Sequence, residues 1–377
     1  MKTSVFLFLL LAPLLPSFAE ANRYIATLRS GLRTSGIVRF GDFNAITIQS
    51  NKSSKDLLRE DNTIELIEPD QEMHIAGEVA NSNQGNIWNP SLWNPSPWNL
   101  DRIDQTSLPL DGRYKPMSRG RGATVYVLDT GIYPKHKEFL VNRARWGLDL
   151  TGEGLVDLHG HGTHVSSTVI GNSLGVANKA KVVMIKVLNR YGSGTYSNLI
   201  RGIEWAIKDS KRIGGCSVLS MSLGGPKSQI VNNAIEAAYR EGLISVVAAG
   251  NDGIDACVNS PGSANSAVTV GASNKADWVP KFSNRGSCVR IHAPGVDILG
   301  AGTGYKTQTK KMTGTSMATP HVAGVIASLL PLYKCNVNRT LTKLMEMSVS
   351  GKLFGLRDGT VNRLVNIRGS SVFNTEF

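Results

Sequence analysis

The chain has 377 residues, with 41 Lys and Arg against 29 Asp and Glu, which gives a formal charge of +12. Hydrophobic residues make up 41% and charged residues 19%, and this ordinary composition excludes wholesale disorder, collagen and coiled coil. Four cysteines in so long a chain exclude a disulfide-dense small scaffold, but they leave room for one or two bridges.

Residues 1–21 have the pattern of a secretory signal peptide. Lys2 precedes an apolar run over residues 5–15, and Ala19 and Ala21 then form an A-x-A cleavage pattern. A buried N-terminal helix is the alternative, but two prolines in the segment argue against it. The pattern predicts a secreted protein in a compartment where disulfides persist, and no later run is long enough to predict a membrane anchor.

Residues 22–80 resemble a small α+β unit. Alternating apolar and polar residues predict strands over 24–28, 43–48 and 63–67, with a short helix over 53–58. Seven basic and ten acidic residues between positions 20 and 86 give this region a net charge of −3, and residues 87–377 carry +14. The opposite charges predict that the two regions associate, unless both only aid solubility.

Residues 81–100 predict a linker. Trp88, Trp93 and Trp98 recur every five residues, and the Asn, Pro and Ser between them favour an extended or turn-rich segment. Two interpretations stay open: some of these tryptophans pack on the rest of the chain, or the repeat has no dedicated role.

Residues 101–377 alternate strand with helix. Continuous apolar runs predict buried strands over residues 123–128, 182–188, 218–223, 243–248 and 267–270, and helices are predicted over 197–211 and 231–240. This order predicts an α/β fold, a parallel sheet covered by helices on both faces. Ligands of such sheets bind beyond the carboxyl ends of the strands.

Polar motifs occur where those strands end or helices begin. Asp129 lies in Asp-Thr-Gly, His161 in His-Gly-Thr-His, Asn251 in Ala-Ala-Gly-Asn, and Ser316 in Gly-Thr-Ser-Met-Ala-Thr-Pro-His. Asp-Thr-Gly alone is a weak signal, because it also occurs in aspartic proteases. In the order Asp, His, Ser, however, the motifs over residues 98–364 resemble the subtilisin-like serine proteases, and their proteinase K-like branch most closely.

This resemblance implies a subtilisin-like fold and a secreted serine endopeptidase that cleaves protein and peptide substrates. It implies Ser316 as the nucleophile, His161 as its base, Asp129 as the group that orients the base, and Asn251 as a donor to the oxyanion. It also implies a self-processing zymogen, in which residues 22–80 are the inhibitory prosegment. We expect no cofactor for catalysis, no nucleic-acid partner, and a monomer.

The resemblance also implies a peptide-binding cleft, although simple loop glycines are the alternative. The matching residues are Ser222, Leu223, Gly224, Gly225, Ala248, Ala249 and Gly250.

The resemblance implies a disulfide between Cys257 and Cys288. It leaves Cys216 and Cys335, whose pairing is open because four cysteines allow three connectivities.

A structural calcium ion is implied as well. It would be held by the Asp297 carboxylate and the backbone carbonyls of Asn265 and Ala267. A turn or helix-capping role for Asp297 is the alternative.

Two other functions have some support in the sequence. His159, His161 and His164 resemble the metal cluster of the metallo-β-lactamase fold, but Thr163 stands where that cluster has Asp, and the Ser316 motif would be unexplained. A protein that only binds peptides would lack a catalytic group, and none is missing. Two departures from the family pattern stand out: Ser166 and Ser167 replace Ala-Gly, and residues 30–39 leave little room for a first helix.

Overall fold

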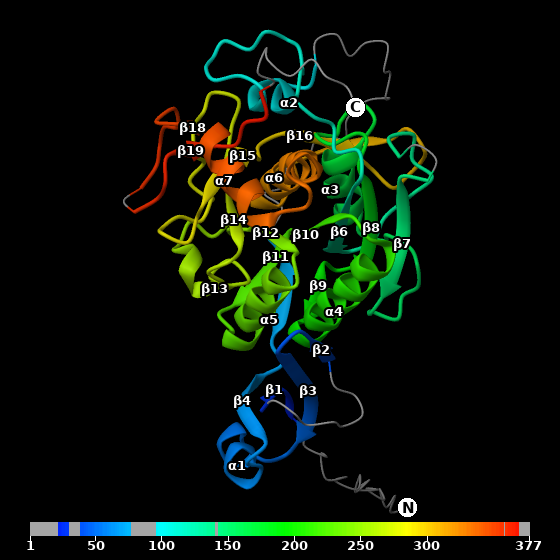
Figure 1. The fold of residues 1–377 in the computed structure, drawn as a ribbon, viewed down its shortest axis with the longest axis vertical. Helices are drawn as coiled ribbons and strands as arrows, with labels where there is room; N and C mark the ends of the chain where they lie inside the picture. The colour runs from blue at the N-terminus through cyan, green and yellow to red at the C-terminus, as the bar shows by residue number, and fades with distance from the viewer. Residues whose placement is uncertain (1–21, 30–37, 77–95, 140–141, 358, 369–377) are drawn as a thin grey trace, which may run out of the picture.

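The computed structural model describes residues 22–29, 38–76, 96–139, 142–357 and 359–368. They form a leader, residues 22–76, and a larger body, residues 96–368 (Figure 1). The expected signal peptide and most of the expected linker lie outside the described residues. Trp98 is described, and it packs against the body's core and begins a helix. The linker that we expected to reach residue 100 therefore ends before this helix.

A nine-stranded sheet forms the centre of the body, in the order β18-β19-β15-β14-β12-β10-β6-β8-β7. Every neighbouring pair from β7 to β19 is parallel, and only β18 pairs antiparallel, which confirms the expected α/β class. The strands are β6 (Ala123–Asp129), β7 (Ala144–Asp149), β8 (Lys181–Lys186), β10 (Cys216–Met221), β12 (Ile244–Ala248), β14 (Val268–Ser273), β15 (Ile291–Pro294), β18 (Val349–Ser350) and β19 (Arg363–Leu364).

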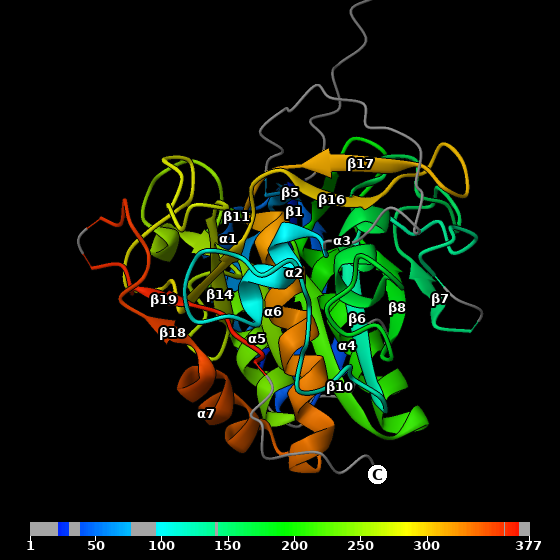
Figure 2. The ribbon, with the colours of Figure 1, turned by 90° about the horizontal axis from the view of Figure 1, so that it is seen from above.

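Helices cover both faces of this sheet (Figure 2). Successive side chains of a strand point to opposite faces, so Val125 and Val127 of β6 enter one apolar core while Tyr126 and Leu128 enter the other. One core is closed by α2 (Trp98–Ile103), α3 (His161–Ile170), α6 (Thr315–Leu329) and α7 (Val337–Met347), and the other by α4 (Tyr196–Ile213) and α5 (Gln229–Arg240).

Helix α6 is buried along its whole length. With the 3-10 helix Leu330–Tyr333 that follows, it is the one helix in the described part of the chain that is long and apolar enough to cross a membrane, and 89% of that window is buried inside the body. Such burial is typical of a core helix.

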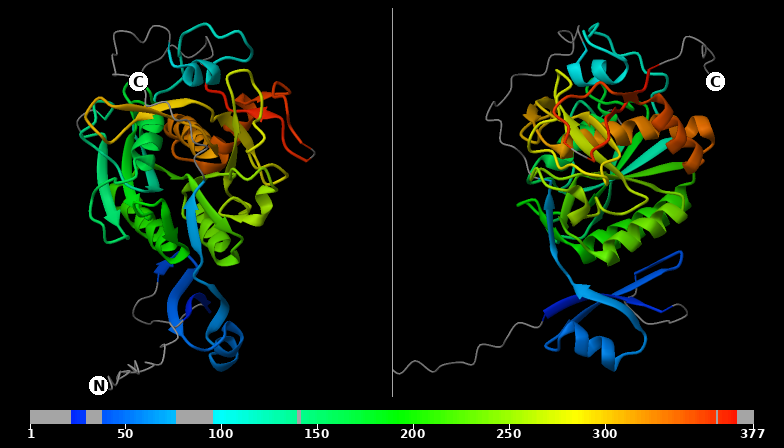
Figure 3. Two further views of the ribbon diagram at one scale, coloured as in Figure 1. Left: turned by 180° about the vertical axis from the view of Figure 1, so that it is seen from behind. Right: turned by 90° about the vertical axis from the view of Figure 1, so that its left-hand side faces the viewer.

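The leader is a four-stranded antiparallel sheet, in the order β2-β3-β1-β4, with one helix. The strands and the helix that we expected here are present, and β2 is an addition. Figure 3 shows this sheet lying beneath α4 and α5. Its elements are β1 (Asn22–Leu28), β2 (Val38–Phe40), β3 (Phe43–Ser50), α1 (Ser54–Glu60) and β4 (Ile64–Pro69).

After its own sheet the leader has a further strand, β5 (Glu72–Ile75), which enters the body (Figure 1). There it becomes an inner strand of a second sheet, in the order β13-β11-β5-β9. The body contributes β9 (Ser193–Thr195), β11 (Leu223–Pro226) and β13 (Asn259–Ser260) to this sheet. The remaining elements are the hairpin of β16 (Ile298–Ala301) and β17 (Thr309–Met312) and the 3-10 helix Ala256–Val258.

Two disulfides cross-link the body. The expected bridge between Cys257 and Cys288 is confirmed. Cys216 and Cys335 pair as well, which resolves the connectivity that the sequence left open.

Candidate active site

Asp129 and His161 form a buried pair. Asp129 is the last residue of the buried strand β6, and His161 is the first residue of α3. The Nδ1 atom of His161 lies 2.8 and 3.0 Å from the two carboxylate oxygens, and both side chains are fully shielded from solvent. The carboxylate therefore fixes the orientation of the ring and favours a proton on Nδ1.

Thr130 connects Asp129 with the start of helix α3, which carries His161. Its N–H donates to the Asp129 carboxylate at 2.7 Å, and its hydroxyl accepts from the N–H of Gly162 at 2.9 Å. Glycine is required at 162 because a Cβ atom would lie 2.1 Å from the carbonyl oxygen of Gly131. The close approach of the two loops thus depends on the glycines of both motifs.

Ser316 and Asn251 converge on one carbonyl group, that of Ala76. The Ser316 hydroxyl lies 3.0 Å from this carbonyl oxygen, and the Asn251 side-chain N–H donates to it at 2.5 Å. The Asn251 side-chain oxygen in turn accepts from the N–H of Thr315 at 2.9 Å, which fixes the amide. A hydroxyl and an amide donor therefore meet at the same carbonyl.

Ala76 is presented at the end of an extended peptide. Strand β5 pairs antiparallel with β11 on one side and with β9 on the other. The N–H of Ile75 donates to Gly192 at 2.9 Å, and that of Ala76 to Ser222 at 3.2 Å. The leader thus binds through main-chain hydrogen bonds, as an added strand.

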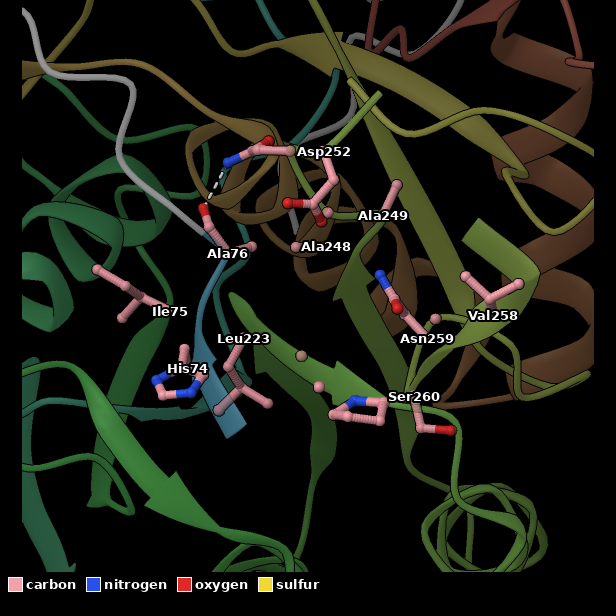
Figure 4. Close-up of a pocket in the computed structure, with 16 residues that line it drawn as sticks. His74, Ile75, Ala76, Leu223, Ala248, Ala249, Asp252, Val258, Asn259 and Ser260 are labelled. Carbon is pink, nitrogen blue, oxygen red and sulfur yellow. Dashed lines mark hydrogen bonds between the residues drawn. The ribbon is translucent and has the colours of Figure 1, made fainter. Parts of the chain in front are cut away.

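A cavity of about 620 Å³ opens beside Ala76 (Figure 4). Six of the seven expected cleft residues line it, and the seventh, Ser222, bonds to Ala76 and Ser316 through its backbone oxygen. The lining residues after Asn251 could not be predicted from the sequence, because no short motif marks them. They are Asp252, Val258, Asn259, Ser260 and Gly262.

Two motif histidines serve packing. The Nε2 atom of His164 bonds to the carbonyl oxygens of Ile298 and Lys310 at 2.9 and 3.1 Å. Burial lowers the pKa of His164 to about 3 and that of His321 to about 4, so both rings are neutral. With His161 held by Asp129 and His164 by carbonyls, the three-histidine metal site is not formed, and no group of three potential metal ligands occurs in the described ranges.

The Ser167 hydroxyl both donates and accepts a hydrogen bond, and His161 at the start of the same helix keeps its contact with Asp129. Ser167 donates to the His164 carbonyl at 2.7 Å and accepts from the N–H of Ala301 at 2.8 Å. The departure from the family pattern thus adds a link between α3 and β16.

The expected calcium ligands are not brought together. Asn265 and Ala267 precede β14, whereas Asp297 follows Gly295, whose N–H bonds to Ser273 at the other end of that strand. Six residue steps of strand separate the two ends by about 20 Å. The Asn265 carbonyl accepts instead from Arg290 at 3.3 Å. Calcium binding stays a prediction, but these three residues do not fit one ion.

The model of the Subtilase family (Peptidase_S8) matches residues 120–369. The chain belongs to the Subtilase family. "Subtilisin-like protease 2" of Pseudogymnoascus destructans (strain ATCC MYA-4855 / 20631-21) is 47% identical over 62% of this chain, and "Subtilase-type proteinase psp3" of Schizosaccharomyces pombe (strain 972 / ATCC 24843) is 40% identical over 80%. The matches span 58% and 66% of those two relatives.

One solved structure is similar over most of this chain. It is described as a cold adapted subtilisin-like serine proteinase, and it is 40% identical to this chain with a TM-score of 0.69. The likeness covers 73% of this chain and all of the other chain. The subtilase fold that the sequence predicted is therefore confirmed.

Acidic side chains of the leader bind the N-termini of two helices of the subtilase body. Glu68 accepts from the hydroxyl of Ser228 at 2.5 Å and from the N–H of Gln229 at 3.0 Å, where α5 begins. Asp70 accepts from the N–H and hydroxyl of Ser197 at 2.9 and 2.6 Å, where α4 begins. Each carboxylate satisfies N–H groups that a helix start leaves without intrahelical partners.

Proposed function

We propose that this chain is a secreted serine endopeptidase made as a self-processing zymogen, and that it cuts its own leader between Ala76 and Gly77. The observation that carries the proposal is the Ala76 carbonyl, which lies against both the Ser316 hydroxyl and the Asn251 amide at the end of a bound peptide strand. The two disulfides and the signal-like segment support secretion.

The chemistry that we propose is acyl transfer to serine, and the nearness of the Ser316 hydroxyl and the Asn251 amide to the Ala76 carbonyl supports it. The Ser316 oxygen attacks the Ala76 carbonyl carbon and gives its proton to His161, and the Asp129 carboxylate stabilises the resulting imidazolium. Negative charge develops on the carbonyl oxygen, to which Asn251 donates; removing one such donor typically costs about 10²–10³ in rate. The amine of Gly77 leaves with the proton from His161, and water then hydrolyses the acyl-enzyme.

The same strand supports inhibition by the leader after the cut. Ala76 would keep its place through the hydrogen bonds of β5, while Glu68 and Asp70 hold the two helix starts. Other protein and peptide substrates would use the same backbone groups of β9 and β11. No step of this chemistry needs a cofactor.

The test is to express the wild type and Ser316→Ala in a host without related proteases. The wild type should be secreted with Gly77 at the N-terminus of its body, and the mutant with its leader still attached. A fluorophosphonate should label and inactivate the wild type, and EDTA should not block the catalytic step. Ser350→Ala, at an exposed serine of β18, is the matched control and should mature normally.

Removal of the leader at the wild-type position and rate in Ser316→Ala would refute self-processing. Failure of the fluorophosphonate to label Ser316 in the mature protein would refute the serine mechanism.

A further inference from the structure

Lys186 is a fully buried cation that the proposed mechanism does not use. It ends β8, beside Asp129 of β6 in the sheet, and its side chain has no exposed surface. Its ammonium group donates to the carbonyl oxygens of Thr130 at 2.6 Å and Leu188 at 2.8 Å. A buried ammonium needs such partners, because an unpaired one carries a large desolvation cost.

Through its contact with Thr130, Lys186 lies next to the segment that holds Asp129 and His161. Thr130 bonds to the Asp129 carboxylate through its N–H and to the start of α3 through its hydroxyl. The ammonium therefore fixes the carbonyl of the residue that connects Asp129 with His161.

The charge of Lys186 is balanced by Glu153, 3.1 Å away. Glu153 lies in a loop held by Asp149, whose carboxylate accepts from the N–H groups of Thr151 and Gly154 at 2.8 and 2.7 Å. Burial opposes the charge on Glu153, but hydrogen bonds from Arg190 and Lys186 outweigh it and hold the pKa of this carboxyl below its usual value. Asp149 is the second acidic group facing Lys186, and its pKa is lowered too.

Glu153 also contacts the segment that binds the peptide. The N–H and Nε of Arg190 lie 3.2 and 3.0 Å from the other Glu153 oxygen. Two residues further on, the Gly192 carbonyl accepts from Ile75, and β9 begins at Ser193. The Glu153 carboxylate thus connects Lys186, the neighbour of Asp129, with β9, the strand that pairs with the peptide.

We propose that Lys186 and Glu153 are positioning residues that couple the Asp129–His161 pair to the peptide-binding strand β9. Binding of a long peptide on β9 then holds the catalytic turn in place, so substrates that reach β9 gain a rate advantage that shorter ones do not. The proposal rests on the proposed endopeptidase function.

The test uses mature enzyme and two p-nitroanilides with the same leaving group. Acetyl-Met-His-Ile-Ala-p-nitroanilide copies residues 73–76 and reaches β9, whereas acetyl-Ala-p-nitroanilide does not. Active sites are titrated with a fluorophosphonate, so that loss of folded enzyme does not enter kcat or KM.

Glu153→Gln should lower kcat/KM for the long substrate about tenfold, mainly through kcat, and change that for the short substrate less than about twofold. Arg190→Ala, at a half-exposed side chain, should act in the same direction without a folding risk. Lys186→Met should also lower kcat for both substrates, and Lys186→Arg should restore part of it. Glu346→Gln, in an exposed pair with Lys343, is the matched control.

If Glu153→Gln and Arg190→Ala lower kcat/KM by the same factor for both substrates, or change it for neither, the coupling is refuted. The proposed function would be left intact. A wild type that hydrolyses neither substrate would refute the proposed function, and this proposal with it.

Discussion

The leader and the body bury their side chains in different ways. The body encloses two large apolar cores, one on each face of its sheet. The leader has only a small core of its own, built on Ala26, Leu28 and Ile64, while Ile25, Phe40, Phe43 and Ala45 join the core of α4 and α5. A chain segment of about 55 residues has little interior of its own. Here, contact with the body buries many of the apolar side chains of the leader. The leader therefore depends on the body for most of its interior, whereas most of the apolar core of the body comes from the body itself.

The largest expected effect concerns the charges that hold the leader. Glu68→Gln combined with Asp70→Asn should weaken inhibition of the mature enzyme by the separate leader by about 100-fold, because hydrogen bonds to charged groups contribute roughly 1.5–3 kcal/mol each. Inhibition constants against a chromogenic peptide measure this. Glu60→Gln, whose side chain is half exposed on α1 and pairs with Lys52 of the leader, is the control and should change little.

A leader whose binding is unaffected by the double substitution would show that apolar contact alone holds it. The difference in how the two regions bury their side chains would remain, but the opposite charges of leader and body would not contribute to binding of the leader.

A smaller effect, on the pH dependence of stability, is expected at Asp104, whose carboxylate lies near Asp101 and Asp111. Burial, together with Asp101 and Asp111, raises the pKa of Asp104 to about 6 from an ordinary value of 3.8, although the N–H of Lys115 opposes the shift. Because the folded state holds this proton more tightly than the unfolded chain, stability should fall as pH rises from about 4 to about 6. Asp104→Asn should remove part of that fall and raise Tm at pH 7 to 8.

Melting curves of the inactive Ser316→Ala form, recorded in EGTA between pH 4 and 8, test this. Near pH 4 the Tm values with and without Asp104→Asn should converge. Parallel curves over the whole range would mean that Asp104 does not carry the proton.

The smallest effect is expected at Asp297. Its carboxylate lies at the end of β14 opposite Asn265 and Ala267, so Asp297→Asn should leave any rise of Tm with calcium unchanged within about 1 °C. Loss of the calcium response in this variant, but not in Asp252→Asn, would restore Asp297 as a ligand.

Sequence predicted the parts of the site whose signal is local. Asp129 ends a continuous apolar run, and His161 and Ser316 begin helices in motifs that fix their backbone, so each could be assigned from its neighbours. Ala76 could not be found this way, because its role arises from pairing of β5 with β9 and β11, more than 100 residues away in the chain. Asp297 was misplaced for the same reason, since only the sheet shows which end of β14 it occupies. Lys186 ends an apolar strand, where a lysine ordinarily indicates the surface, and burial of its side chain is a property of the tertiary fold.

Helix α6 has a consequence for the order of events during synthesis. All its residues from Thr315 to Leu329 are buried, and Ser316 sits on its first turn. The proposed nucleophile therefore reaches its place only when the interior of the body has closed around this helix. Under the proposed function, an incompletely folded chain would lack the catalytic arrangement and could not digest itself or its neighbours. The first bond within reach of the folded chain would then be the one after Ala76.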